Sequence, residues 1–166
     1  MLTASYLVDH YQMQAHPEGG FYKQTYRSDE YLNTAHLPGR FGGERVISTA
    51  IYFLLEGNQF SAFHRIKSDE LWHFYYGTSL NIYVIHLNGE LKIIKLGNNI
   101  VEGENFQTVV PAGCWFASKP VKEEGFSFVG CTVAPGFDFA DFELAKANSL
   151  IKEYPQHKDL IRRLCR

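Results

Sequence analysis

Hydrophobic and polar residues alternate with the two-residue period of β-strands through most of this chain. Between residue 21 and about residue 136, short turns separate these runs, and Asn88-Gly89 is the strongest hairpin signal among the turns. Short connections predict that neighbouring strands are antiparallel. The predicted strands are residues 21–27, 46–55, 59–66, 70–76, 80–87, 90–96, 106–110, 114–116 and 125–133.

A helical period replaces this alternation only at the two ends of the chain. Thr3 is the predicted N-cap of a short helix, because apolar residues recur at helical spacing between residues 4 and 11. After residue 136 the pattern predicts a second helix that Pro155 ends, and then a third short helix up to about residue 164. Asp138, Asp141 and Glu143 are expected to cap these C-terminal helices and complement their dipoles.

We therefore predict a single all-β domain over residues 1–166. Its sandwich or barrel of about nine or more antiparallel strands occupies about residues 16–136, and its C-terminal helices occupy about residues 139–164. The runs at 50–55 and 71–76 are apolar on both strand faces, so each needs cover on both sides. This pattern predicts a homodimer with these strands near the interface.

Composition and charge narrow the functional classes. A chain of 166 residues can bury a core without disulfides or a structural metal. Its 16 basic and 18 acidic residues give a net charge of -2 without long runs, so neither nucleic acid nor a membrane is an expected partner. No apolar stretch has the length of a membrane span and no signal peptide is evident, so a cytoplasmic location is expected. The 3 cysteines form no CxxC pair and are expected to be reduced thiols.

Aromatic residues are the exception in this composition, with 13 Phe, 10 Tyr and 2 Trp. Many of them lie in the predicted strands, where His64 and Glu70 each share a face with apolar neighbours. These neighbours are Phe60, Ala62 and Ile66 in the first strand, and Trp72, Phe74 and Tyr76 in the second. If both faces point inward, His64 and Glu70 meet over an aromatic lining, as in many small-molecule sites. His73 is out of phase with Glu70 and is expected on the opposite face.

The spacing around His64 resembles the first motif of the cupin superfamily. That motif has two histidines separated by one residue, then a glutamate, then a glycine seven residues after the glutamate. His64, Glu70 and Gly77 take these places, whereas Ile66 stands at the second histidine.

The segment PAGCWF resembles the second cupin motif. Pro111 and Gly113 match its turn, but Phe116 stands where that motif has a histidine ligand. A usual cupin metal site has three imidazoles and one carboxylate. The resemblance therefore predicts the cupin fold, but most of the usual metal ligands are absent.

The order of five blocks is similar to one subgroup in particular, the cupin_5 family, formerly DUF985. The blocks are HPEGGFYKQTYRS, STAIYFLL, the His64 segment, VPAGCWF and FVGCTVAPGFDFADFELA, which together extend from about residue 16 to residue 145. The resemblance implies a dimeric jelly-roll barrel with a central pocket. Members are similar in fold to the sugar-nucleotide epimerases of the rhamnose pathway and to seed storage proteins, and most have no established activity.

His64 and Glu70 are the candidate catalytic residues, because a carboxylate near an imidazole orients it and raises its basicity. The candidate ligand-binding residues are His16, Glu18, Tyr22, Arg27, Trp72, Phe74, Tyr76 and Phe116. In this hypothesis His16 and Glu18 close one end of the pocket, or of the partner subunit's pocket. Arg27 meets an anionic ligand group, a role that Lys23, Arg45 or Lys67 could also fill. The structural alternative is a buried histidine, a carboxylate at a strand start and an exposed first strand.

Three functions remain open, and they come from different classes. The first is a metal-independent binding module whose aromatic pocket holds a small polar or ring-shaped metabolite. The second is a sugar or nucleotide-sugar epimerase or isomerase in which His64 is the base, although no residue matches the acid that such an enzyme needs on the opposite face. The third is a metal-dependent cupin enzyme with a degenerate divalent-metal site at His64, Glu70, and water or His73. Enzyme status is therefore open, and no cofactor is assigned.

Overall fold

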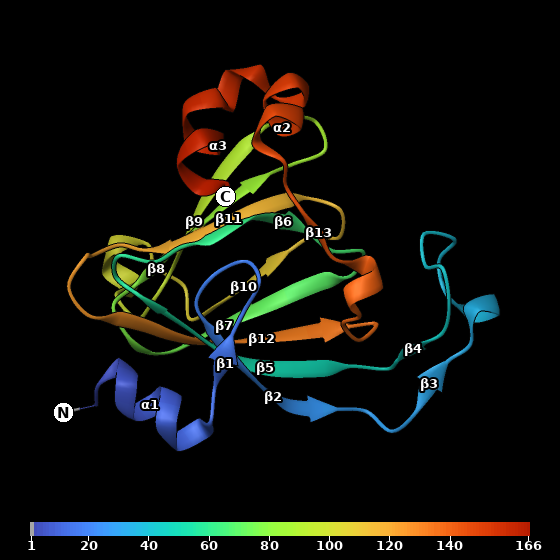
Figure 1. Cartoon of the computed structure of the whole chain (residues 1–166), viewed down its shortest axis with the longest axis horizontal. Helices are drawn as coiled ribbons and strands as arrows, with labels where there is room; N and C mark the ends of the chain where they lie inside the picture. The colour runs from blue at the N-terminus through green and yellow to red at the C-terminus, as the bar shows by residue number, and fades with distance from the viewer. Residues whose placement is uncertain (1) are drawn as a thin grey trace.

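The computed structural model describes residues 2–166, which form two antiparallel sheets packed face to face (Figure 1). The six-stranded sheet has the order β1 (Gln14–Ala15), β2 (Phe21–Arg27), β5 (Thr49–Glu56), β12 (Phe126–Ala134), β7 (Asp69–Gly77) and β10 (Gln107–Val110). The five-stranded sheet has the order β13 (Glu143–Leu144), β6 (Ser61–Arg65), β11 (Trp115–Pro120), β8 (Leu80–Ile85) and β9 (Leu91–Leu96). The all-β prediction is confirmed, and the Asn88-Gly89 turn joins β8 to β9.

Helices lie at the two ends of the chain. The helix α1 (Ala4–Tyr11) begins where predicted, since the Thr3 hydroxyl accepts a hydrogen bond from the Tyr6 N–H at 3.2 Å. The C-terminal helices are α2 (Ala147–Glu153) and α3 (Lys158–Leu164), joined by the 3₁₀ turn η4 (Pro155–His157). They start later than predicted, because the 3₁₀ turn η3 (Phe139–Asp141) and strand β13 occupy the preceding residues. A further 3₁₀ turn, η2 (Ile100–Glu102), precedes β10.

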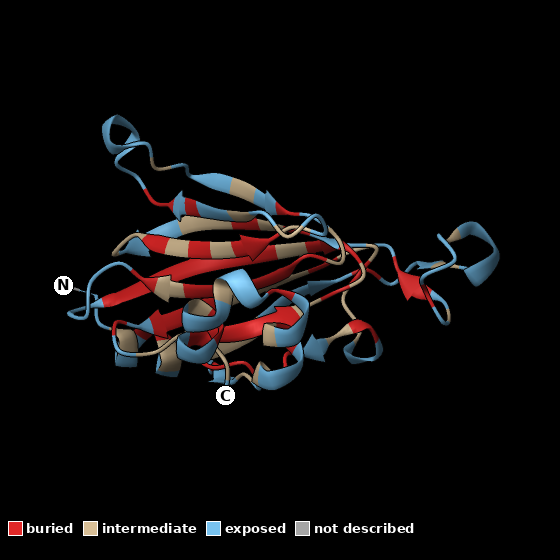
Figure 2. Cartoon of the chain, turned by 90° about the horizontal axis from the view of Figure 1, so that it is seen from above, coloured by how far each residue is buried: buried red, intermediate tan, exposed pale blue. Residues whose placement is uncertain are grey.

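Three apolar clusters hold these layers together. The largest lies between the sheets and contains Phe53, Trp72 and Phe116, none of which is more than 1% exposed. A second lies between the five-stranded sheet and the C-terminal helices, and a third lies under α1. Figure 2 shows the buried residues concentrated along the strands. The sandwich is therefore covered by helices on both sides.

Helix α1 covers the outer face of the run at residues 50–55, one of the two runs that are apolar on both faces. Leu54 points to the outer face of the six-stranded sheet and is fully buried under α1. On the same outer face, Tyr75 and Val109 are 49% and 45% exposed. The homodimer predicted from these runs stays a prediction.

A short arm projects from the sandwich (Figure 1). It consists of β3 (Tyr31–Leu32), the 3₁₀ turn η1 (Thr34–His36) and β4 (Arg45–Val46). Arg45 ties the base of this arm to η3, because its Nε and Nη2 atoms donate to the two carboxylate oxygens of Asp141 at 2.6 Å each. Both side chains are buried, so the bond is shielded from water.

The acidic residues after β12 therefore have different roles from the one predicted. Only Asp138 caps a helical turn, since it accepts from the Ala140 N–H at the start of η3. Asp141 pairs with Arg45, and Glu143 pairs with Arg65 on the surface. Neither acid lies in the first turn of α2, so neither can complement the dipole of that helix. Both form ion pairs with residues of distant segments instead.

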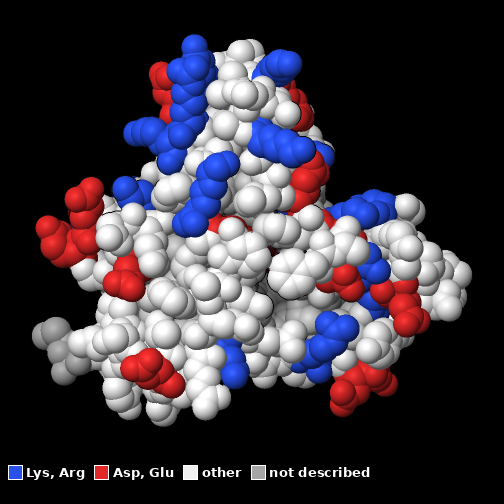
Figure 3. All heavy atoms as spheres, in the orientation of Figure 1, with Lys and Arg blue, Asp and Glu red and all other residues white. Residues whose placement is uncertain are grey.

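Over residues 2–166, no helix is long and apolar enough to cross a membrane. The three cysteines are free thiols, two of them buried. Basic side chains gather over the C-terminal helices, whereas the centre of the face in Figure 3 carries few charges.

Candidate functional site

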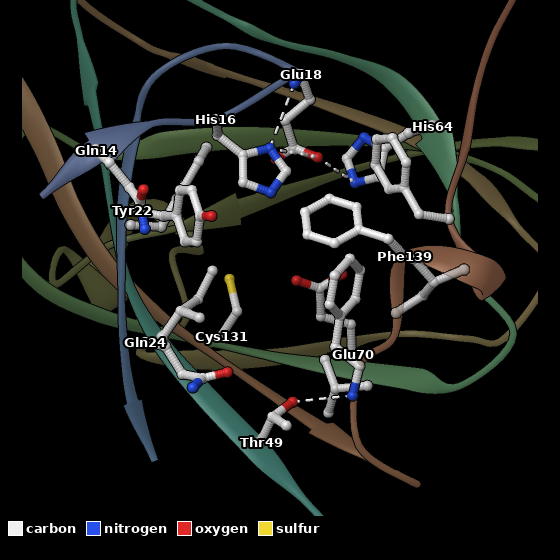
Figure 4. Close-up of a pocket in the computed structure, with 16 residues that line it drawn as sticks. Gln14, His16, Glu18, Tyr22, Gln24, Thr49, His64, Glu70, Cys131 and Phe139 are labelled. Carbon is white, nitrogen blue, oxygen red and sulfur yellow. Dashed lines mark hydrogen bonds and ion pairs between the residues drawn. The ribbon is translucent and has the colours of Figure 1, made fainter. Parts of the chain in front are cut away.

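A cavity of about 230 Å³ lies between the two sheets at the end crossed by η3 (Figure 4). Its polar lining is Gln14, His16, Glu18, Tyr22, Gln24, Thr49, His64, Glu70 and Cys131. Its apolar lining is Ile51, Phe53, Ile66, Val133, Phe137, Phe139 and Phe142. Within the described part of the chain, no Lys or Arg lines it. Among the described residues, the site therefore combines several polar groups with an aromatic wall and contains no Lys or Arg side chain.

The turn between β1 and β2 brings Glu18 into this cavity. Gly19 and Gly20 have φ values of 116° and 75°, and a Cβ at Gly19 would lie 2.2 Å from the carbonyl oxygen of Phe60. The Glu18 carbonyl accepts from the Ala62 N–H at 2.8 Å, which fixes the turn against β6. Two glycines are thus required for the carboxylate to reach the interior.

His64 and Glu18 form a buried ion pair. The His64 Nδ1 atom lies 2.7 Å from the carbonyl oxygen of Ala62, which can only accept, so Nδ1 donates. The Nε2 atom lies 2.9 Å from Oε2 of Glu18. A neutral imidazole has one N–H, so this second hydrogen bond requires a second proton between the ring and the carboxylate. His64 and Glu18 are 3% and 5% exposed.

The pKa values of this pair agree with that proton count. Burial alone lowers the pKa of His64, but the charge and hydrogen bond of Glu18 outweigh it and raise that pKa above its ordinary value. Burial alone raises the pKa of Glu18, but the charge and hydrogen bond of His64 outweigh it and lower that pKa. A protonated His64 has no lone pair with which to take a proton from a ligand.

His16 differs from His64 in its protonation. Its Nδ1 atom accepts a hydrogen bond from the Glu18 N–H at 3.3 Å, so the proton of the neutral ring is on Nε2. Burial lowers the pKa of His16 although the charge of Glu18 opposes this. Figure 4 shows the second ring nitrogen turned toward the cavity. His16 therefore presents a neutral N–H donor to a bound molecule.

Glu70 is the second buried carboxyl group of the cavity. It lies near the start of β7, is 8% exposed, and is turned toward the cavity beside the Cys131 thiol (Figure 4). Burial raises the pKa of Glu70 to about 7, although the charge of His64 lowers it, and Glu18 adds to the rise. Near neutral pH, Glu70 thus has comparable protonated and ionised populations.

The raised pKa of Glu70 predicts how stability depends on pH. The pKa of Glu70 is about 7 in the folded protein and 4.5 in the unfolded chain, so the folded protein binds this proton more tightly. The resulting contribution to the free energy of unfolding is fully present below pH 4.5 and is lost as pH rises toward 7. Glu70→Gln removes this loss, so the stability of the variant relative to wild type should rise by roughly 3 kcal/mol from pH 4.5 to pH 8. Urea unfolding across this range measures it.

The exposed Glu90→Gln substitution is the control for that measurement, because it removes a carboxyl group that is not buried. If the free energy of unfolding changed with pH equally in wild type and Glu70→Gln, this would contradict the raised pKa of the buried Glu70.

Five of the residues singled out from the sequence lie together in the cavity: His16, Glu18, Tyr22, His64 and Glu70. The carboxylate bonded to His64 is Glu18, which comes from another part of the chain than Glu70. The closeness of His64 to Glu70 in the motif therefore does not predict the bonding partner of His64.

The other five ligand-binding candidates are outside the cavity lining. Arg27 is exposed at the end of β2, and Trp72, Phe74 and Phe116 pack in the core between the sheets. Phe116 supports the site indirectly, since its ring centroid lies 4.1 Å from that of His64.

Tyr76 is on the outer face, and the reason is a β-bulge. Val129 pairs with Phe74 but Phe128 pairs with Tyr76, so Tyr75 is an extra residue in β7. The bulge reverses the alternation and leaves Tyr76 42% exposed. His73, before the bulge, lies on the expected outer face and hydrogen-bonds with Thr132 Oγ1 at 3.1 Å.

Arg45 and Lys67, named as alternatives to Arg27, already have a carboxylate partner. Arg45 bonds to Asp141, and Lys67 Nζ lies 3.5 Å from the same carboxylate. Neither residue lines the cavity, and Lys23, the third alternative, does not line it either, so no Lys or Arg proposed from the sequence faces a ligand there.

The sequence did not predict many of the residues that line the cavity. The segment 137–142 supplies three phenylalanines, and the strands supply Gln14, Gln24, Thr49 and Cys131. The cluster of rings in GFDFADF was the available signal, but nothing in its spacing shows which sheet it crosses. The Phe137 N–H donates to Thr49 Oγ1 at 2.9 Å, and this contact attaches the segment to β5.

Comparison with known proteins identifies this architecture. A family model described as Cupin superfamily (DUF985) matches residues 5–145. The chain belongs to this cupin family. An uncharacterized protein of Saccharomyces cerevisiae is 30% identical over 156 residues, which cover 88% of this cupin and 77% of the yeast protein.

Solved structures agree with this assignment. A protein from Shewanella oneidensis has 41% identity and a TM-score of 0.90, covering 100% of this cupin and 99% of that chain. A hypothetical protein from Leishmania major has 31% identity and a TM-score of 0.91, covering 99% of each chain. Oxalate decarboxylase of Bacillus subtilis, at 16% identity and a TM-score of 0.54 over 90% of this chain and 36% of its own, shares the fold alone. The predicted cupin-type jelly roll is confirmed.

The donor set of this cupin does not fit the usual cupin metal. Ile66 and Phe116 stand at two ligand positions, and both nitrogens of His64 are used by Ala62 and Glu18. Within residues 2–166, no group of three His, Cys, Asp or Glu side chains is arranged to hold an ion. Stable sites generally use at least three protein ligands, which this donor set does not provide.

Proposed function

We propose that this cupin is a metal-independent binding protein for a small, uncharged, polar metabolite. The observation that carries the proposal is the charge balance of the cavity: the Glu18 carboxylate and the His64 imidazolium neutralise each other, Glu70 is partly protonated near neutral pH, and no Lys or Arg side chain of the described residues lines it. Burying an anion there would leave its charge without a partner, which is costly. This argues against a nucleotide sugar, whose phosphates need cationic or N–H partners.

The size and lining of the cavity support a ligand of about monosaccharide size. Its volume of about 230 Å³ is below the roughly 300–1,000 Å³ typical of sites for drug-sized ligands. His16, Glu70 and Gln24 offer donors and acceptors from three strands or turns, while Phe139 and Phe142 offer an apolar face. Such a site suits a ring or short chain that carries hydroxyl or carbonyl groups on one side and C–H groups on the other.

The test is a thermal-shift and calorimetric screen of uncharged sugars and hydroxyketones, each beside its phosphate monoester. A ligand at a hundredfold excess over its Kd stabilises the fold by about 2.7 kcal/mol. For a chain of this size that raises Tm by roughly 5–10 °C. We expect at least one uncharged compound to bind saturably, its phosphate ester to bind far more weakly, and EDTA treatment to change nothing.

Matched variants show whether binding occurs in the cavity. Ile51→Phe fills space against the lining and should abolish binding, whereas Ile93→Phe makes the same change on the exposed surface of β9 and should not affect it. Stronger binding of the phosphate esters, or binding that needs added metal, would overturn the proposal.

A further inference from the structure

The cavity also contains the parts of a proton-transfer site, in an arrangement that does not use His64 as the base. Glu70 and His16 both face the cavity, one from β7 and the other from the β1–β2 turn (Figure 4). His64 is excluded from the base role because its two nitrogens donate to Ala62 and Glu18. The groups free to act on a bound molecule are therefore a carboxyl and a neutral imidazole N–H.

We propose that Glu70 is a general base, and His16 the hydrogen-bond donor to the developing oxyanion, in the enolisation of a small uncharged α-hydroxycarbonyl compound. This proposal rests on the proposed function, since it takes the same cavity and the same ligand class. It replaces the His64-based hypothesis, because geometry assigns the proton acceptor and the oxyanion donor to other residues.

The step balances without any co-reactant. The Glu70 carboxylate takes the proton from the carbinol carbon, the C–H electron pair becomes the C=C bond of an enediolate, and the carbonyl oxygen takes the negative charge. The His16 Nε2–H stabilises that charge by a hydrogen bond. The remaining hydroxyl proton then passes between the two enediolate oxygens. Glu70 returns its proton to the former carbonyl carbon, which completes a 1,2-shift, or to the original carbon, which gives exchange alone.

The surroundings of both residues suit these roles. The pKa of about 7 for Glu70 keeps a useful fraction of carboxylate at neutral pH while leaving it basic enough to take a proton from carbon. His16 is held neutral by burial, and the Glu18 N–H fixes its tautomer. A neutral imidazole opposite a glutamate base is the pairing that the isomerisation of a triose phosphate uses in an unrelated fold. Glu18 acts here as a positioning residue.

The aromatic wall helps to protect the reactive intermediate. Phe139 stacks on His16 with ring centroids 6.4 Å apart, and Phe142 lies 6.1 Å from the same ring. Phe139 is 54% exposed and Phe142 is half-buried, so these rings form the boundary between the oxyanion side of the cavity and solvent and would partly shield the Nε2–H bond from water.

The experiment measures deuterium wash-in by NMR for dihydroxyacetone, D-erythrulose and D-fructose incubated in heavy water with the full-length protein. Wild type should catalyse exchange of a carbon-bound proton above the buffer rate for at least one of them. Glu70→Gln, a neutral substitution of the same shape, should lower the rate by about a hundredfold or more. His16→Phe keeps the ring packing and should lower it by about a hundredfold. Glu90→Gln, on the surface, should exchange like wild type.

Binding of the same three compounds is measured in parallel, so that two failures are distinguished. Saturable binding without exchange overturns the proton-transfer role and leaves the binding function standing. No binding of any of the three overturns this inference and counts against the proposed function. Exchange that persists in Glu70→Gln but disappears in His64→Gln would return the base role to His64 and overturn the assignment.

Discussion

Replacing Glu18 with alanine is expected to lower the free energy of unfolding by about 3–5 kcal/mol at pH 6, because it leaves the buried His64 without its counter-charge. The His64 Nε2 atom lies 2.9 Å from the Glu18 carboxylate, and both residues are almost fully buried. Urea unfolding measures the loss. NMR titration of the imidazole should show the pKa of His64 falling from above to below its ordinary value.

The surface pair of Arg65 and Glu143 provides a matched control. Its N···O distance is 2.7 Å, as short as in the buried pair, but Glu143 is 55% exposed in its side chain. Glu143→Ala should therefore cost less than about 1 kcal/mol. Equal losses for the two substitutions would contradict the argument that burial, and not distance, determines the strength of the Glu18 pair.

A second variant separates the charge from the space that Glu18 fills. In Glu18→Gln the amide N–H can donate to Nε2 of a neutral His64, so all hydrogen bonds are kept without ionisation. Since the wild-type fold binds the His64 proton more tightly than the unfolded chain does, its advantage over Glu18→Gln should be largest below about pH 6.5 and should shrink as pH rises through the raised pKa of His64. A constant difference across pH 5–8 would mean that His64 is not charged in the wild type.

Replacing Arg45 with methionine is expected to cost about 3 kcal/mol, because the buried Asp141 carboxylate then keeps only its 3.5 Å contact with the partly exposed Lys67. Arg45 makes two hydrogen bonds of 2.6 Å to Asp141, and their side chains are 7% and 4% exposed. Asp141 ends η3, whose Phe139 lines the cavity. The variant should therefore also bind the ligand more weakly. Urea unfolding and calorimetry check the two effects.

The double substitution Arg45→Met with Asp141→Leu tests the cause. Removing both charges should recover most of the stability, since two apolar side chains of similar size pack without desolvation cost. If the double variant is as unstable as the single one, the arm is held by shape and not by the ion pair. Glu143→Leu, which removes the exposed partner of Arg65, is the control and should cost less than about 1 kcal/mol.

Local signals predicted the elements of this fold well. The Thr3 cap and the Asn88-Gly89 turn depend on neighbours a few residues away, and both occur as expected. Alternation placed Glu70 and Trp72 on the inward face of β7 for the same reason. Alternation failed at Tyr76, because one extra residue in a strand reverses the faces and leaves no mark in the hydrophobic pattern.

The sequence by itself determined the strands, the cupin blocks and the residue types available for chemistry, since these depend on local pattern and order. Tertiary structure alone decided how they combine. Glu18 meets His64 across 46 positions, and Arg45 meets Asp141 across 96, because sheet packing brings distant segments together. Only that packing shows how the two carboxyl groups differ near neutral pH: Glu18 is ionised beside the His64 cation, while burial leaves Glu70 with comparable protonated and ionised populations.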